Sequence, residues 1–270
     1  LVSEHAASSF SSSSPESSAL SASSTPGTPG PVVRARATGP GASRPRRGGR
    51  AALSPSRAKD FMQCPLLFRL RTVDRIPDPG SLATHKGTLV HGVLERLYDL
   101  PPRERTREAA RAMLPSQWET HREKSPDVMG LFDDPTRVAP WLEEAGALLD
   151  AYFRMEDPTR LEPAERELLV QTETRDGLLL RGFVDRLDVA PDGAMRVVDY
   201  KTGRSPGPRF QAEALFQMRF YALVLWRLRG RAPRRLQLLF LKDGRTLTHD
   251  PHPAELEVAE TRIARIWDEI

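Results

Sequence analysis

Cysteine is almost absent from this sequence, because Cys64 is the only one in 270 residues. A single thiol excludes a disulfide framework within the chain and a metal site built from several of its own cysteines. This cysteine usage fits a reducing compartment, and we expect the protein to act in the cytoplasm.

Long apolar runs are also missing. No stretch approaches the roughly 20 apolar residues that a membrane-spanning helix needs, so we expect no membrane association. The first ten residues, LVSEHAASSF, contain no basic segment followed by an apolar one, so we expect no secretory signal. The chain has no G-x-x-x-x-G-K-[ST] loop, and ATP hydrolysis by this chain alone is therefore not expected.

An excess of positive charge is confined to the N-terminal segment. The protein has 40 Lys and Arg residues against 36 Asp and Glu, but residues 1–50 contain six Arg and two Glu. The remainder is formally neutral, so overall basicity gives no argument for nucleic-acid binding by that part. Residues 1–50 are rich in Ser, Pro, Gly, Ala and Arg, which predicts a disordered tail. Its arginines either contact phosphates or only keep the tail soluble.

Residues 51–270 carry the periodic apolar patterns of one folded domain. Helical patterns begin after Ser54 and continue at residues 81–100, 103–121 with an interruption at Pro115, 138–155, 210–228 and 254–270. Strand patterns occupy residues 167–173, 178–189, 195–200 and 236–241, and a hairpin turn is predicted around Asp176. This order predicts an α+β domain with a central mixed sheet flanked by helices.

The strongest candidates for functional residues lie in GFVDRLDVAPDGAMRVVDYKTG, residues 182–203. Pro191, Asp192 and Gly193 form a turn signal between two strand patterns. Asp199 and Lys201 point to the same face because a strand has a period of two, and strand pairing brings Asp185 near Asp199. Two buried carboxylates need a compensating charge, and a divalent cation with oxygen ligands supplies it.

Each of these features also has an ordinary interpretation. An isolated Asp-x-Lys at a strand end is usually a surface ion pair. His91 lies within a predicted helix, where a histidine is more often structural than a ligand. Tyr221 lies on an amphipathic helix, where a tyrosine is usually part of the core. The combination of these features in one chain favours a functional site over the separate structural explanations.

The segments GFVD and VVDYKTG resemble motifs II and III of the PD-(D/E)XK nuclease superfamily. They are most similar to its RecB-like exonuclease branch, which includes the AddB nuclease domain. The spacing from Gly87 to His91 and Glu95 resembles motif I of that branch, and Gln217 with Tyr221 resembles its Gln-x-x-x-Tyr motif. The resemblance extends from about Leu53 to the C-terminus. It implies a restriction-endonuclease-like core with helical inserts that shape a channel toward a metal.

The resemblance also implies roles for individual residues. The metal ligands for one or two Mg²⁺ or Mn²⁺ ions would be His91, Asp185, Asp199 and the backbone carbonyl of Tyr200. Lys201 would act with the two aspartates in catalysis, by orienting or deprotonating the attacking water and stabilising charge on the phosphate.

Gln217 and Tyr221 would position the substrate backbone or the catalytic lysine. Together these roles describe a Mg²⁺-dependent deoxyribonuclease, expected to be an exonuclease of DNA repair or recombination. Its partners would be DNA, as single strands or duplex ends, and a helicase subunit.

Cys64 has a further implied role. Members of this branch often hold a four-iron four-sulfur cluster with one early cysteine and three near the C-terminus. Cys64 matches the early position and the other three are absent. Either there is no cluster, or the native chain continues past Ile270 with three more cysteines. The predicted final helix reaches Ile270 without a cap, so we expect the nuclease domain to be truncated there.

Two alternatives remain from other functional classes. In the first, the chain is a non-catalytic DNA-binding or scaffold module of a helicase–nuclease repair complex. In the other, the tail of residues 1–50 is a nucleic-acid tether and recruitment is the main function. Metal binding separates the first alternative from a nuclease, and deletion of the tail separates the second.

Overall fold

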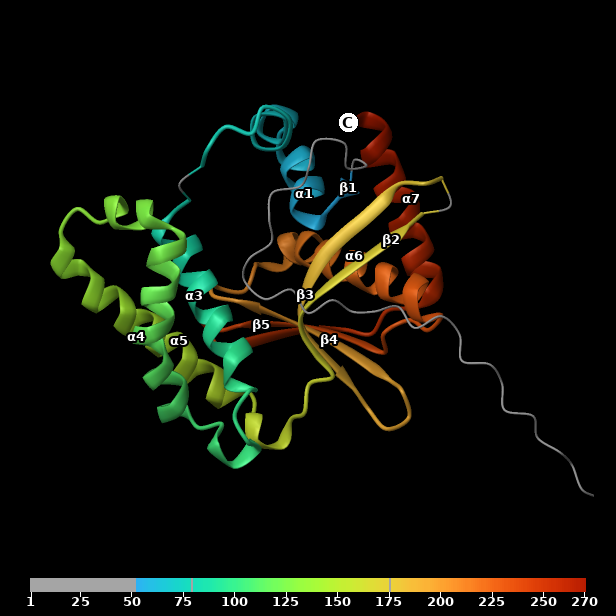
Figure 1. Ribbon diagram of the computed structural model, residues 1–270. Coiled ribbons are helices and arrows are strands. Elements are labelled where there is room, and N and C mark those ends of the chain that lie inside the picture. The colour runs from blue at the N-terminus through green and yellow to red at the C-terminus, as the bar shows by residue number, and fades with distance from the viewer. Residues whose placement is uncertain (1–51, 79, 175) are drawn as a thin grey trace, which may run out of the picture. The chain divides into compact units, whose positions relative to one another are not determined.

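The computed structural model describes residues 52–78, 80–174 and 176–270 (Figure 1). The predicted disordered tail, residues 1–50, lies outside the described residues. Of the domain expected at residues 51–270, the structure describes residues from Ala52 onward.

The described residues form a six-stranded mixed sheet. Its strands are β1 (Ala52–Leu53), β2 (Glu165–Glu173), β3 (Leu179–Val189), β4 (Met195–Lys201), β5 (Arg235–Phe240) and β6 (Arg245–His249). They follow the order β1-β3-β4-β5-β6, and β2 pairs with β3. The β1–β3 and β4–β5 pairs are parallel, and the β2–β3, β3–β4 and β5–β6 pairs are antiparallel.

The turn between β3 and β4 forms where the sequence predicts it. Gly193 has a φ of 76°, which a residue without a Cβ adopts at little cost. The side chain of Asp192 accepts a hydrogen bond from the backbone N–H of Ala194 at 2.8 Å. This tight turn fixes the register of the two strands that carry Asp185 and Asp199.

One face of the sheet is covered by helices α1 (Pro55–Gln63), α6 (Gln211–Arg229) and α7 (Pro253–Glu269) (Figure 1). The side chain of Ser54 caps α1 by accepting from the N–H of Arg57 at 3.3 Å, and Gly230 ends α6 with a φ of 68°. The core between these helices and the sheet includes Val197 from β4 and the fully buried Phe220 from α6.

The opposite face packs against helices α3 (Leu82–Leu97), α4 (Arg107–Lys124) and α5 (Val138–Met155), drawn in green in Figure 1. Val198 and Tyr200 from β4 belong to this second core. Neighbouring residues of β4 therefore reach opposite layers, as the period of a strand requires.

Short helical turns connect the main elements. They are α2 (Pro65–Phe68), the π-helical turn Arg69–Val73, and the 3₁₀ turns Pro102–Glu104, Pro126–Leu131, Pro135–Arg137, Pro158–Arg160 and Pro208–Phe210. Three of these turns lie between α3 and α5.

The predicted interruption at Pro115 is wrong, because α4 continues through it. A proline inside a helix removes one backbone hydrogen bond and costs about 3 kcal/mol or more. Leu114 and Trp118 are buried on the same helix and pack into the second core, which offsets that cost. The helix begins at Arg107 rather than at residue 103, since Thr106 caps it by accepting from the N–H of Ala109.

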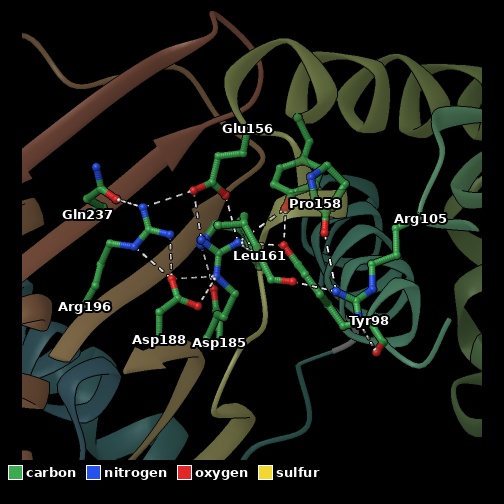
Figure 2. A network of polar contacts seen from close by, with 12 residues as sticks. Tyr98, Arg105, Glu156, Pro158, Leu161, Asp185, Asp188, Arg196 and Gln237 are labelled. Atoms are coloured by element: carbon green, nitrogen blue, oxygen red, sulfur yellow. Dashed lines mark hydrogen bonds and ion pairs between the residues drawn. The ribbon is translucent and has the colours of Figure 1, made fainter. Parts of the chain in front are cut away.

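A buried arginine joins the second helical layer to the sheet. Figure 2 labels its partners Tyr98 and Glu156 within this polar network. Arg186 on β3 is 1% exposed and forms a two-pronged ion pair with Glu156, with distances of 2.8 and 2.9 Å. The same guanidinium donates to the hydroxyls of three tyrosines, which are Tyr98, Tyr152 and Tyr200. These bonds hold α3 and α5 against the strand that carries Asp199 and Lys201.

The architecture is a mixed central sheet with helices on both faces, which confirms the predicted α+β class. None of the helices in the described part of the chain is long and apolar enough to span a membrane.

Candidate active site

The site lies where β3 and β4 separate. Backbone pairing between these strands extends from the turn as far as Arg186 and Val198. At the next position the Oδ2 atom of Asp185 accepts a hydrogen bond from the backbone N–H of Tyr200 at 2.7 Å. The side chain of Asp185 therefore replaces a backbone carbonyl of the ladder, and this bond fixes the carboxylate at the opening.

Helix α3 brings His91 to the same opening from the second helical layer. Its Nε2 atom lies 2.9 Å from the carbonyl oxygen of Tyr200, and its Nδ1 atom lies 3.5 Å from Oδ2 of Asp185. A carbonyl can only accept, so Nε2 donates in this arrangement. Burial lowers the pKa of His91, and the charge of Lys201 acts in the same direction. The imidazole is thus kept neutral, the form in which histidine binds metals.

A second group of polar side chains lies on the α6 side of the opening. Lys201 Nζ lies 2.6 Å from Oδ2 of Asp199 and 3.0 Å from Oε1 of Gln217. Gln217 Nε2 donates to Oδ1 of Asp199 at 2.9 Å and to the hydroxyl of Tyr221 at 3.1 Å. Helix α6 therefore holds both the carboxylate and the ammonium of the Asp-x-Lys segment.

Asp199 as a whole residue is 2% exposed, and its Oδ2 atom has no directed hydrogen bond. The ammonium of Lys201 is close enough for an ion pair, but its direction does not satisfy the oxygen as a hydrogen bond would. A buried carboxylate oxygen without a full set of partners is costly, and a cation is the partner that such an oxygen accepts most readily.

The structure adds Glu167, which lies in none of the sequence motifs. His91, Glu167 and Asp185 each offer one ligand atom, and these atoms lie within 4.8 Å of one another. Glu167 comes from β2, where residues on either side of it pair with β3 around the position of Asp185. A signal was available in the sequence, because the hairpin predicted around Asp176 places Glu167 opposite Asp185.

The backbone and the charge at Glu167 are both unusual. Its φ is 44°, in a region that residues with a side chain seldom adopt and that is enriched at functional sites. Burial raises the pKa of Glu167 to about 7, with further increases from the charges of Glu95 and Asp199. Burial and the charge of Asp199 also raise the pKa of Asp185. The opening thus gathers acidic groups that repel one another in the absence of a cation.

These donors fit a hard divalent cation. Carboxylate and carbonyl oxygens with one imidazole suit Mg²⁺ and Mn²⁺. While Nε2 of His91 donates to the carbonyl of Tyr200, its Nδ1 atom, 3.5 Å from Oδ2 of Asp185, is the imidazole nitrogen that can bind an ion. The partner-deficient oxygen of Asp199 and the raised pKa values of Asp185 and Glu167 are further features that a bound cation would relieve.

Cys64 lies apart from this group. It is half-buried, and its backbone links α1 to α2, with its N–H donating to Asp60 O at 2.9 Å and its carbonyl accepting from Phe68 N at 3.1 Å. Its role as an iron–sulfur ligand stays a prediction.

Comparisons with known proteins place this geometry in a family. The chain is 27% identical over 190 residues to the Gene 69 protein of Mycobacterium phage D29. That alignment covers 58% of this chain and 65% of the phage protein, so the chain spans less than two thirds of that relative. A family profile described as the PD-(D/E)XK nuclease superfamily matches residues 52–270, which include all the residues of the candidate site. The chain therefore belongs to the PD-(D/E)XK nuclease superfamily.

Proposed function

We propose that this protein is a metal-dependent deoxyribonuclease that hydrolyses phosphodiester bonds at the opening between β3 and β4. The observation that carries the proposal is the group of His91, Glu167 and Asp185 beside the Asp199–Lys201 ion pair. A scaffold protein has no need for Glu167, Asp185 and Asp199 together, because buried or half-buried carboxylates that repel one another lower stability.

The proposed ligands of Mg²⁺ or Mn²⁺ are His91, Glu167, Asp185, Asp199 and the carbonyl of Tyr200. A divalent cation in such a site lowers the pKa of a bound water and neutralises charge on the phosphate. The hydrogen bond from the N–H of Tyr200 holds Asp185 in one orientation, so the carboxylate is positioned before any ligand arrives. This preorganisation lowers the cost of assembling the site.

Lys201 is the proposed catalytic cation. Its side chain is 32% exposed, whereas that of Asp199 is 3% exposed, so the ammonium faces the solvent side of the pair. There it can orient a water or bind a phosphate oxygen. Gln217 accepts from Lys201 and donates to Asp199, and it therefore sets the direction of both. Tyr221 holds Gln217 through its hydroxyl.

The finer assignment is to the RecB-like branch, as an exonuclease of DNA repair or recombination in the cytoplasm. It is supported by the order of the motifs, in which His91 precedes the Asp-x-Lys segment and Gln217 and Tyr221 follow it. A helicase subunit is the proposed protein partner. A four-iron four-sulfur cluster at Cys64 is proposed only for a longer native chain with three more cysteines.

The test compares the wild type with Asp199→Ala on linear DNA, single-stranded and double-stranded, in Mg²⁺ and in Mn²⁺. Asp176→Ala is the matched control, since Asp176 is an exposed acid in the β2–β3 turn. We expect cleavage by the wild type and the control, and loss of at least 100-fold in Asp199→Ala. Cleavage by Asp199→Ala at the wild-type rate refutes the assignment.

Calorimetric titration with Mn²⁺ separates a nuclease from a scaffold. We expect the wild type to bind the ion, and Asp185→Asn to bind it at least tenfold more weakly. A protein that binds DNA but neither binds Mn²⁺ nor cleaves is a scaffold. Deletion of residues 1–50 should leave cleavage intact, whereas a recruitment function predicts loss of DNA binding.

A further inference from the structure

Two surface grooves meet at the candidate site. One has a volume of about 850 Å³ and runs between α1, α6 and the start of β3. The other has a volume of about 1010 Å³ and runs along α3 and α4 past His91 and Glu167. The residues that line both grooves are Phe183, Lys201, Arg204 and Phe240. The proposed catalytic lysine therefore lies at the junction of a path that continues on both sides.

Phe183 is the exposed aromatic side chain at this junction. It is 43% exposed, whereas Val184 beside it is fully buried and Phe240, the other shared phenylalanine, is 5% exposed. Phe183 precedes Asp185 by two residues on β3, so both side chains leave the same face of the strand. Its backbone pairs with Leu169 of β2, which fixes the point from which the side chain leaves the strand. Within the described residues the ring stacks on no other aromatic side chain.

The charges along the first groove suit a polyanion. Arg57, Lys59, Arg181 and Arg204 line it, against one acid, Glu213, which pairs with Lys59 at 3.3 Å. Neither Arg181 nor Arg204 forms an ion pair within the part of the chain that the structure describes. These guanidinium groups are available for phosphates, Arg181 in the first groove and Arg204 at the junction.

We propose that Phe183 is a substrate-positioning residue that stacks on one nucleobase of a single strand as the strand passes from one groove to the other. This proposal rests on the proposed nuclease function. An exposed ring can stack on a base only when that base is not already stacked within a duplex. Because Phe183 and Asp185 share a strand face, the stacked base fixes which phosphate reaches Lys201.

The first experiment removes the base instead of the protein side chain. Labelled 12-nucleotide oligothymidylates, each with one abasic position, are cleaved by the wild type and by Phe183→Ala in Mg²⁺. Stacking of one base on an aromatic side chain is worth about 1–3 kcal/mol, which corresponds to a change of about 5- to 150-fold in kcat/KM. We expect the wild type to lose kcat/KM by this factor when the base is missing at one position near the cut, and Phe183→Ala to show no such sensitivity.

Further variants separate stacking from simple packing. Phe183→Trp and Phe183→Tyr should retain kcat/KM, and Phe183→Leu should be as impaired as Phe183→Ala, because leucine keeps apolar bulk without a stacking face. Val189→Ala is the matched control, since Val189 is a 36% exposed residue of the same strand outside both grooves. Rescue by leucine, or equal abasic sensitivity in wild type and Phe183→Ala, overturns the proposal.

A binding measurement gives a readout without cleavage. In Phe183→Trp, with EDTA present, addition of oligothymidylate should quench tryptophan fluorescence beyond the change that the four native tryptophans give in the wild type. The same quenching in both proteins contradicts stacking at residue 183. A failure of the nuclease proposal gives a different result from a failure of the stacking proposal, because the wild type would then leave every substrate uncut.

Discussion

Replacement of Glu167 by glutamine should make the metal-free protein more stable at neutral pH, although it removes a proposed ligand. The pKa of Glu167 rises from an ordinary value of 4.5 to about 7 on folding. A carboxyl group with a raised pKa keeps its proton in the folded state after the unfolded chain has lost it. The unfolded state then binds fewer protons, so stability falls as pH rises from about 4.5 to about 7 and stays constant above.

The size of the effect follows from that shift. About 2.5 pKa units at 1.36 kcal/mol each give about 3 kcal/mol of destabilisation above pH 7, and less than about 1 kcal/mol at pH 5. Glutamine has the same shape and no charge to bury. For a domain of this size 1 kcal/mol corresponds to about 2–4 °C in Tm. We therefore expect Glu167→Gln to melt about 6–12 °C above the wild type at pH 8 in EDTA.

The assay is thermal unfolding from pH 5 to pH 8, with and without Mn²⁺. Glu165→Gln is the control, because Glu165 lies on the same strand and outside the acidic group. A Tm difference that is the same at pH 5 and pH 8, or a variant less stable than the wild type at pH 8, refutes the reasoning. Mn²⁺ at 100 times its Kd should remove most of the difference, since it adds about 2.7 kcal/mol to the wild type and less to the variant, which lacks one donor.

Three further substitutions test the framework of the site. Arg186→Ala removes the two-pronged partner of Glu156, leaves it only Arg196 at 3.5 Å, and should cost about 3–5 kcal/mol in urea unfolding. Gly182→Ala should cost about 1–3 kcal/mol by overpacking, because a Cβ atom there would lie 2.6 Å from a ring carbon of Tyr221. Tyr221→Phe removes the hydroxyl that accepts from Gln217, so we expect kcat to fall about tenfold while stability changes by about 0.5–1.5 kcal/mol.

Arg186→Ala and Gly182→Ala each have a matched control. Arg181→Ala removes an exposed arginine from the same strand and should leave stability within about 0.5 kcal/mol. Gly203→Ala adds a Cβ atom where nothing lies within 4 Å and should be similarly neutral. Equal losses in a variant and its control contradict the packing argument. For Tyr221→Phe, unchanged kcat shows that Gln217 holds Lys201 without help from the tyrosine.

The local sequence rules predicted the strands that carry the motifs, and the reason is the short distance over which those rules act. Pro191, Asp192 and Gly193 define a turn, and the two-residue period of a strand puts Asp199 and Lys201 on one face. The hairpin brings Asp185 to the same end. These relations span fewer than about 20 residues, so turn chemistry and periodicity determine them with little help from the rest of the fold.

Turn chemistry and periodicity did not predict the contacts between distant segments. The proline rule predicted a break at Pro115, but packing of Leu114 and Trp118 keeps the helix intact. Arg186 reads as a charged residue in a strand, yet it is buried because tyrosines and Glu156 reach it from other elements. A local pattern contains no information about partners such as Tyr98 and Glu156, which are 88 and 30 residues away along the chain.

For this protein, the sequence alone determined the Asp185–Asp199–Lys201 hairpin, the resemblance to a nuclease family and the mixed sheet between helices. Only the tertiary structure decided that His91 joins Glu167 and Asp185, that Glu167 has a positive φ, and that Phe183 lies exposed where two grooves meet. The physical reason is that turns and periodicity act along the chain, whereas burial, charge repulsion and groove shape depend on how distant elements pack.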